Sequence, residues 1–510
     1  MQKAFKQHEC SAAMVGTGGG WLRIQVITTD CAEVYSQFGD IFLRLLKATN
    51  RQLYKILHKY WSHSFHPIVA NDYKHTSAMD SSNRIATSRR HDLDNLRTFL
   101  TCLVIAHHTS LVYGGSGLWP LKSACFSSTT GPLLTFQAIN QSIGMGLFFW
   151  ISGRMSAQML ERWSRSEFLQ KKILRLGLPT LVYTILINPM TFAFTIPILD
   201  FHSVVRGLLD YWKSIRGVRG PVWYTALLLV FDIVAALIQK PLIGPRLKLH
   251  DAQEHRQWDI LVYRALGKWG WLGIAAASFF VRLWYPVGTV MEPLSIQPAY
   301  LPQYIFAYSL GYLSVQQNED RFTGPFGRAT DTTKPPEEGD PSTNHVRSNA
   351  LPLRFTLTIS ILILPACIIP QIWANWSGQP IDSSDLTKGG WNLSALIYAV
   401  WNEFSFVLVG PALMAHFQHW YNRPAASWLW QARHSYAAYL IHPPVSVAIE
   451  LLIDWFIFAG GKGLCASDMG WWMIARPLIF IGGVGLVNSV VSFALGRLLV
   501  TYVPGVRKIV

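Results

Sequence analysis

Long apolar stretches alternate with short polar segments along most of this chain. A helix of about 20 apolar residues crosses a hydrocarbon core of about 30 Å. Ten stretches approach this length: roughly 96–113, 132–152, 174–199, 221–239, 269–286, 299–316, 354–373, 391–416, 434–457 and 474–499. The pattern predicts an all-α, polytopic membrane protein with about ten transmembrane helices, the third of them broken by Pro189 and Pro197.

Two regions outside these stretches differ in composition. Residues 317–350 are rich in Pro, Gly, Asp, Thr and Ser, which predicts a disordered cytosolic loop. Residues 1–80 include a segment, 38–61, with helical apolar spacing and a basic face. A helix on the membrane surface and a poorly ordered extension both fit that segment. The predicted domains are therefore an N-terminal cytosolic extension, 1–80, and a transmembrane domain, 90–500.

Basic residues lie mainly on one side of the predicted membrane. With a cytosolic N-terminus, the cytosolic loops hold 26 Lys and Arg and the opposite loops hold 8, as the positive-inside bias predicts. The segment 200–220 is an exception with four basic residues. It is either an interfacial helix or a sign that the third span is misplaced. Both termini are predicted to be cytosolic. The protein is predicted to lie in an endomembrane or in the plasma membrane.

Composition agrees with a membrane protein. Only 14% of the 510 residues are charged, against about 25% in soluble proteins. The net charge of +15 is explained by loops that face anionic headgroups, and no basic-aromatic surface predicts nucleic-acid binding.

The six Cys form no CxxC pair, so no metal site is predicted. On the outer side, a disulfide between Cys125 and Cys465 is possible, and Asn375 and Asn392 are predicted glycosylation acceptors.

The first span carries ionisable residues, which are rare inside a membrane. Arg97 and His108 are eleven positions apart; at about 100° per residue they share one helix face, roughly 16 Å apart. His107 points away from that face. Asp94 is placed to pair with Arg97 if the helix begins before it. A functional polar seam and a structural histidine bonded to another span both remain open.

Two later spans add candidates. Glu403, midway along the eighth span, either orients His108, as a carboxylate orients a catalytic imidazole, or forms a structural pair. His442 precedes Pro443 and Pro444, a doublet expected to kink the ninth span. It either lines the same cavity as His108 or bonds backbone that the kink leaves free.

Five short motifs occur one after another along residues 90–500. The first is Arg-x10-His within "DNLRTFLTCLVIAHH", and the later ones are GLFFWISGRMSA (146–157), KILRLGLPTLVY (172–183), GPVWYTALLLVFD (220–232) and SYAAYLIHPPV (435–445). Together they resemble the acyltransferase 3 family of multispanning membrane acyltransferases. Parts of these motif sequences also resemble the branch that succinylates bacterial glucans, and similar chains occur in fungi.

The resemblance implies an enzyme that moves an acyl group, acetyl or similar, from cytosolic acyl-CoA to a hydroxyl of a glycan, lipid or small metabolite. Acyl-CoA would be a co-substrate, with no tightly bound cofactor. His108 would be the general base, since imidazole titrates near neutral pH. Arg97, and Arg175 if it does more than orient its span, would bind CoA phosphates. Direct transfer and a covalent acyl-histidine both remain open.

The remaining motif residues are predicted to bind substrate: Trp223, Tyr224, Ser435, Tyr436 and His442. A membrane-interface belt explains Trp223 and Tyr224 nearly as well, and packing explains Ser435 and Tyr436. The alternative function is a multispanning transporter of protons or small solutes, which would favour paired inverted repeats that this sequence does not clearly show. An inactive scaffold is a third alternative.

Overall fold

The computed structural model describes residues 89–123, 125–126, 130–195, 201–238, 249–316, 351–370, 388–425, 427, 429–458 and 470–509. The predicted extension 1–80, the predicted loop 317–350 and Asn375 lie outside these residues. Within them the chain is helical, and the only β-pairing is one isolated bridge between Met291 and Ile296. The all-α prediction is confirmed.

Helices occupy all ten predicted spans. They are α2 (His91–Val112), α3 (Gly131–Leu160), a third segment (Arg165–Ala193), α8 (Trp223–Ile238), α9 (Leu249–Trp284), α10 (Leu301–Gln316), α11 (Leu353–Ile363), α13 (Leu393–Trp420), α14 (Ala432–Phe458) and α15 (Gly470–Tyr502). By length and composition, five described segments can cross a membrane: Arg165–Ala193, Gly220–Ile238, Leu393–Trp420, Ala432–Ile457 and Ala475–Tyr502. For the other five, membrane crossing stays a prediction.

The third segment remains helical through its prolines. It runs through α4 (Arg165–Lys172), η1 (Ile173–Gly177), α5 (Leu178–Val182), η2 (Tyr183–Ile187) and α6 (Asn188–Ala193). The π-helical turns η1 and η2 come just before Pro179 and Pro189. A proline has no N–H for the carbonyl four residues earlier, and a widened turn accommodates its ring. The predicted break at Pro189 is therefore wrong, and Pro197 lies outside the described residues.

Helix α7 (Phe201–Lys213) accounts for the basic exception at 200–220. It is a separate helix after the third segment, and three of its large apolar side chains are exposed: Val205, Leu209 and Trp212. Trp212 Nε1 donates to the Ile185 carbonyl at 3.0 Å, which Pro189 leaves without its helical N–H. A short helix with an exposed apolar side fits the interfacial alternative.

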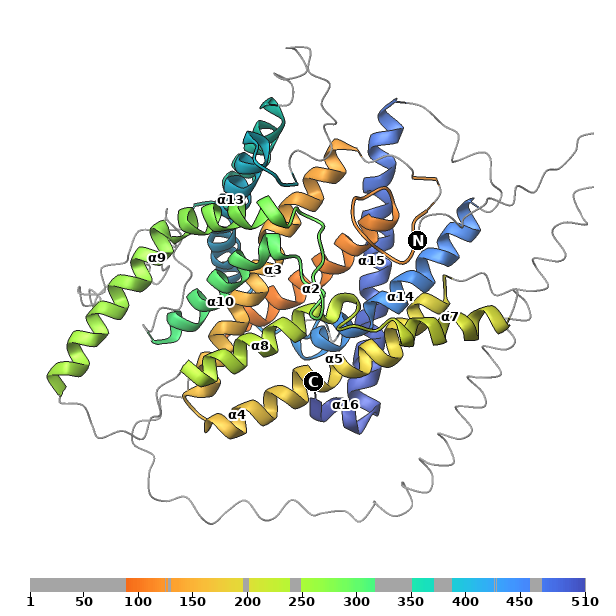
Figure 1. Cartoon of the computed structure of the whole chain (residues 1–510). Helices are drawn as coiled ribbons and strands as arrows, with labels where there is room; N and C mark the ends of the chain where they lie inside the picture. The colour runs from red at the N-terminus through yellow and green to blue at the C-terminus, as the bar shows by residue number, and fades with distance from the viewer. Residues whose placement is uncertain are drawn as a thin grey trace, which may run out of the picture. The chain divides into compact units, whose positions relative to one another are not determined.

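Helix α2 is surrounded by other helices, with contacts to α3, α13, α14 and α15 (Figure 1). Next to it, α3 packs along α10, and α14 packs along α15. Glycines permit the first of these contacts. A Cβ on Gly311 would lie 1.9 Å from the Trp150 carbonyl oxygen, and one on Gly153 would lie 2.1 Å from the Tyr308 carbonyl oxygen. The two backbones therefore touch, as small residues allow between membrane helices.

Candidate active site

A pocket lies between α2, α3, η1, α8 and α14. Its empty volume, including the opening to solvent, is about 770 Å³. Five residues singled out from the sequence line it: Arg97, Arg175, Tyr224, Ser435 and Tyr436. The fold thus brings together candidates from four separate motifs.

Three basic side chains line this pocket, and one of them forms a close ion pair with an aspartate of the protein. Lys172 is buried and forms an ion pair with Asp232 at 2.8 Å. Arg97 has a looser partner, with Nη1 at 3.8 Å from Asp94 Oδ1. Arg175 is close enough to Arg97 for their like charges to interact. Two neighbouring guanidinium groups suit an anion that presents several oxygens, such as a phosphate.

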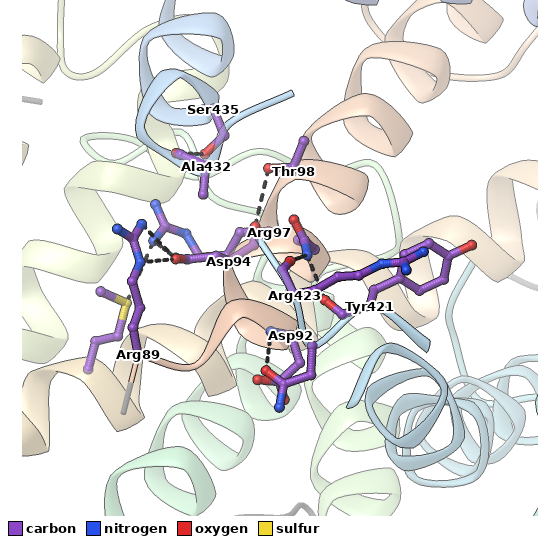
Figure 2. A network of polar contacts seen from close by, with 12 residues as sticks. Arg89, Asp92, Asp94, Arg97, Thr98, Tyr421, Arg423, Ala432 and Ser435 are labelled. Atoms are coloured by element: carbon purple, nitrogen blue, oxygen red, sulfur yellow. Dashed lines mark hydrogen bonds and ion pairs between the residues drawn. The ribbon is translucent and has the colours of Figure 1, made fainter. Parts of the chain in front are cut away.

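Asp94 connects Arg97 to Arg89 at the beginning of α2 (Figure 2). Arg89 Nε donates to Asp94 Oδ2 at 2.8 Å, so one carboxylate serves both arginines. Asn95 Nδ2 donates to the Tyr421 carbonyl at 2.6 Å, which ties α2 to the end of α13. The pairing of Asp94 with Arg97 confirms that the helix begins before Asp94, and these contacts fix where Arg97 meets the pocket.

Tyr224 lies inside the protein. Its side chain is 8% exposed, and its hydroxyl is 2.8 Å from Ser152 Oγ. The interface-belt interpretation is therefore wrong for Tyr224. Trp223 stacks on Tyr304 with 5.6 Å between ring centroids, so it packs beside the pocket.

Tyr436 holds the backbone of Arg175. Its hydroxyl donates to the Arg175 carbonyl at 2.7 Å. That carbonyl lacks its helical partner because Pro179, four residues on, has no N–H. Ser435 also lines the pocket, and its hydroxyl donates to the Ala432 carbonyl at 2.7 Å. Tyr436 therefore positions a neighbouring cation, and Ser435 is a satisfied lining group.

Further along α2, His108 meets His442. His108 Nδ1 lies 2.7 Å from His442 Nε2, and the two ring planes are nearly parallel, at 8°, with centroids 5.0 Å apart. His442 Nδ1 lies 2.6 Å from the Tyr439 carbonyl oxygen, the one that Pro443 deprives of its helical N–H. The bond to freed backbone, one of the two alternatives left open for His442, is therefore confirmed. The ring also contacts His108, but neither histidine is among the residues that line the pocket.

These contacts fix the protons on both rings. A carbonyl only accepts, so His442 Nδ1 carries the hydrogen and donates. Burial of an unpaired charge is unfavourable, so His442 is neutral, its Nε2 accepts, and His108 Nδ1 donates. His108 Nε2 therefore keeps its lone pair, in a ring that is only partly buried. Trp119 covers the ring by stacking at 4.4 Å and 23°.

Tyr439 connects the histidine pair to the pocket. Its side chain lines the pocket, and its carbonyl anchors His442. Sequence reasoning missed Tyr439, although Ser435, Tyr439 and His442 are spaced four and three residues apart and therefore lie on one helix face. Trp119 was also missed, and no periodic signal marks it because it lies in the segment after α2.

Comparison with known proteins identifies the family of this chain. Residues 90–495 match the model of the Acyl_transf_3 acyltransferase domain. The chain belongs to the acyltransferase 3 family. Glucans biosynthesis protein C from Escherichia coli K12, SMS-3-5 and O1:K1 / APEC is 29% identical over 133 residues, which cover 26% of this chain and 32% of each relative. No solved structure matches the chain significantly.

In this member of the acyltransferase 3 family, Glu403 does not orient His108. Its Oε1 accepts from Asn402 Nδ2 at 2.9 Å and from Ser278 Oγ at 3.1 Å. The orienting partner of His108 is His442. The suggested Glu403–His108 pairing is wrong because α13 presents Glu403 to α9, whereas His108 faces α14.

The outer-side predictions have mixed outcomes. Asn392 caps α13: its Oδ1 accepts from the Ala395 N–H at 2.8 Å, and its Nδ2 donates to the Gly389 carbonyl at 2.9 Å. Glycosylation there would have to open this cap, and it stays a prediction.

Cys125 is disulfide-bonded, and Cys465 lies outside the described residues. Within the described ranges, no cluster of His, Cys, Asp and Glu is arranged to hold a metal ion.

Proposed function

We propose that this chain is an integral membrane O-acyltransferase. It moves an acyl group, acetyl or similar, from acyl-CoA at the cytosolic side to a hydroxyl of a glycan, lipid or small metabolite. The observation that carries the proposal is the hydrogen bond between His108 and His442, because it leaves a lone pair on His108 Nε2. Membership of the acyltransferase 3 family supports the reaction class.

His108 acts at two points of the transfer. Its Nε2 takes the proton of the acceptor hydroxyl, and the hydroxyl oxygen attacks the thioester carbonyl carbon. When the carbon–sulfur bond breaks, the CoA sulfur leaves as a thiolate and takes that proton from Nε2. His108 is neutral again afterwards. His442 accepts from Nδ1 throughout, which keeps the ring oriented and stabilises the transient imidazolium.

Arg97 and Arg175 bind the phosphates of the donor. Arg97 and His108 lie on one face of α2, roughly 16 Å apart along its axis. An extended donor, with phosphates at one end and a thioester at the other, matches that arrangement. Among the described residues, neither guanidinium has a close ion pair of the kind that holds Lys172. The two arginines thus fix one end of the donor and leave its thioester to reach the base.

The test uses the purified full chain in detergent with labelled acetyl-CoA and two acceptors, a glucose oligosaccharide and a membrane lipid extract. His108→Ala should reduce transfer by about 10²- to 10⁴-fold, the usual contribution of a general base. His107→Ala is the matched control, because His107 is the adjacent ring and its Nδ1 has no hydrogen-bond partner among the described residues. This variant should keep activity. Full activity in His108→Ala would remove the proposed base.

A second measurement addresses the transporter alternative. Proteoliposomes that hold the chain are supplied with acetyl-CoA, and both solute uptake and CoA release are followed. The proposal expects CoA release that depends on an acceptor. Uptake of protons or solute with no consumption of acetyl-CoA would contradict the enzyme and support a transporter.

A further inference from the structure

Arg282, near the end of α9, is a buried cation without hydrogen-bond partners. Its side chain is 0% exposed, and no described residue bonds its Nε, Nη1 or Nη2. An unmatched buried donor costs about 1–3 kcal/mol, and a charged one costs more. Most buried polar groups in native folds are matched, so three unmatched nitrogens on one side chain call for an explanation.

Two tyrosine rings flank this guanidinium. Its central carbon lies 5.4 Å from the ring centroid of Tyr300 and 5.1 Å from that of Tyr398. Ring faces stabilise a cation, but they provide no acceptor in the plane of the N–H groups. The rings therefore explain how the charge is tolerated, and they leave the donor edge of Arg282 available.

Unmatched acceptors lie on side chains that contact Glu403, a carboxylate that interacts electrostatically with the same cation. Glu403 interacts electrostatically with both Arg282 and Gln303. Asn402 Oδ1 and Gln303 Oε1 are buried and have no hydrogen-bond partner among the described residues. An anion could only accept from Arg282, and Glu403 would repel it. A hydroxyl accepts from the guanidinium and also donates to a carbonyl or carboxylate oxygen, so it matches both kinds of group.

A row of aromatic rings connects this cluster to the pocket. Tyr224 lines the pocket and contacts Trp223 at 6.4 Å between centroids. Trp223 stacks on Tyr304 at 5.6 Å, and Tyr304 stacks on Tyr300 at 6.5 Å. Tyr300 then faces Arg282. The cluster and the pocket are therefore joined by side chains in contact with one another.

We propose that Arg282 and Glu403, with the rings of Tyr300 and Tyr398, form a binding site for an uncharged, hydroxyl-rich group of the acceptor, such as a sugar ring. The term acceptor rests on the acyltransferase function proposed above. Binding of the polyol does not require transfer and can be measured without it.

The experiment follows thermal unfolding of the purified full chain with neutral probes, maltotriose and inositol, and with anionic probes, acetate and inorganic phosphate. The neutral probes should raise the Tm of the wild type, and the anions should not. Arg282→Met should abolish this rise, measured against the unliganded Tm of the variant itself. Arg354→Met, at an exposed arginine in α11, is the control and should respond like the wild type.

Glu403→Gln gives an independent arm if Arg282→Met does not fold. It should raise the acceptor KM by about 10- to 100-fold, the loss expected for a hydrogen bond to a charged group, and leave the acetyl-CoA KM unchanged. An unchanged acceptor KM would overturn the site.

Three other results would also overturn the site. No response of the wild type to either neutral probe would do so. A lower Tm of Arg282→Met with an intact probe response would show that Arg282 stabilises the fold and does not bind the probe. Stabilisation by acetate or phosphate that Arg282→Met removes would make this an anion site. If the polyol binds through Arg282 but acetyl-CoA is never consumed, the proposed function fails and the site stands.

Discussion

His442 donates its Nδ1 hydrogen to the Tyr439 carbonyl, which is the carbonyl that Pro443 leaves without a helical hydrogen bond. The Tyr436 hydroxyl likewise donates to the Arg175 carbonyl, which Pro179 leaves without a helical hydrogen bond. In a bilayer such carbonyls must be satisfied inside the protein. The prolines of these helices thus position a base and a cation, because the side chains that bond the freed carbonyls belong to the site.

Pro443→Ala should weaken catalysis without weakening the fold. The new N–H at position 443 would bond the Tyr439 carbonyl, and His442 would lose its sole acceptor there. The ring would then be free to turn, so kcat should fall by about 10- to 100-fold, the usual effect of losing an orienting partner. Labelled acyl transfer gives kcat, and thermal unfolding should show an equal or higher Tm, since alanine suits a helix better than proline.

Pro444→Ala is the matched control for that variant. It restores an N–H to the carbonyl of Leu440, which takes no part in the histidine pair. Transfer should stay near the wild-type rate. An equal loss of kcat in both variants would show that the bend of α14, and not the Tyr439 carbonyl, controls the site.

His442→Ala should lower kcat with little change in the KM for acyl-CoA. The variant removes the acceptor that holds His108 Nδ1–H, so the His108 ring can take the other tautomer and turn its lone pair away. Loss of the orienting group in a comparable triad costs about 10⁴-fold. His442→Gln keeps an acceptor oxygen and should recover part of the rate. A merely structural role for His442 predicts no difference between Ala and Gln variants of equal Tm.

The ten helices and the shared face of Arg97 and His108 follow from sequence because apolar length and helical period are local properties. Buried polar residues made the first span harder to classify. Helix α2 buries four uncharged polar side chains, Thr98, Thr101, Thr109 and Ser110, and it also holds the partly buried His107 and His108. These lower its apolar content, so length and composition alone do not select it as a membrane span.

The partners of the candidate residues could not be predicted in the same way. His108 and His442 are 334 positions apart, and their contact depends on how α2 packs against α14. Glu403 looked like an orienting carboxylate from its depth in a span, but the direction it faces on α13 decides its partner. Depth follows from position in the sequence, whereas direction follows from tertiary packing.

Arg97→Lys should raise the KM for acyl-CoA by about tenfold or more, because an ammonium cannot make the forked contacts of a guanidinium with a phosphate. With dephospho-CoA thioesters, which lack one phosphate, the effect should shrink if Arg97 binds that group. Arg89→Lys, at an exposed residue that shares Asp94, should behave like the wild type. A change in kcat alone would place Arg97 at the reacting atoms and contradict the donor-binding role.

The last prediction concerns the buried ion pair between Lys172 and Asp232. Asp232 is 0% exposed, and it also accepts from Ser156 Oγ at 2.6 Å and from the Tyr308 hydroxyl at 2.7 Å. Lys172→Met leaves this carboxylate without its cation, so the fold should lose about 3–5 kcal/mol. The measurement is thermal unfolding in detergent, with a clear drop in Tm expected.

Two variants separate charge loss from general damage to the third segment. Lys171→Met changes the exposed neighbour, which lies 3.2 Å over the Trp163 ring, and should cost about 1 kcal/mol or less. Lys172→Met combined with Asp232→Asn removes both charges and keeps an acceptor for the two hydroxyls. It should recover most of the Tm, since replacing both members of a buried pair is far less harmful than breaking it. If the double variant is as unstable as Lys172→Met, the lysine stabilises this segment through packing, and the ion pair is not the cause.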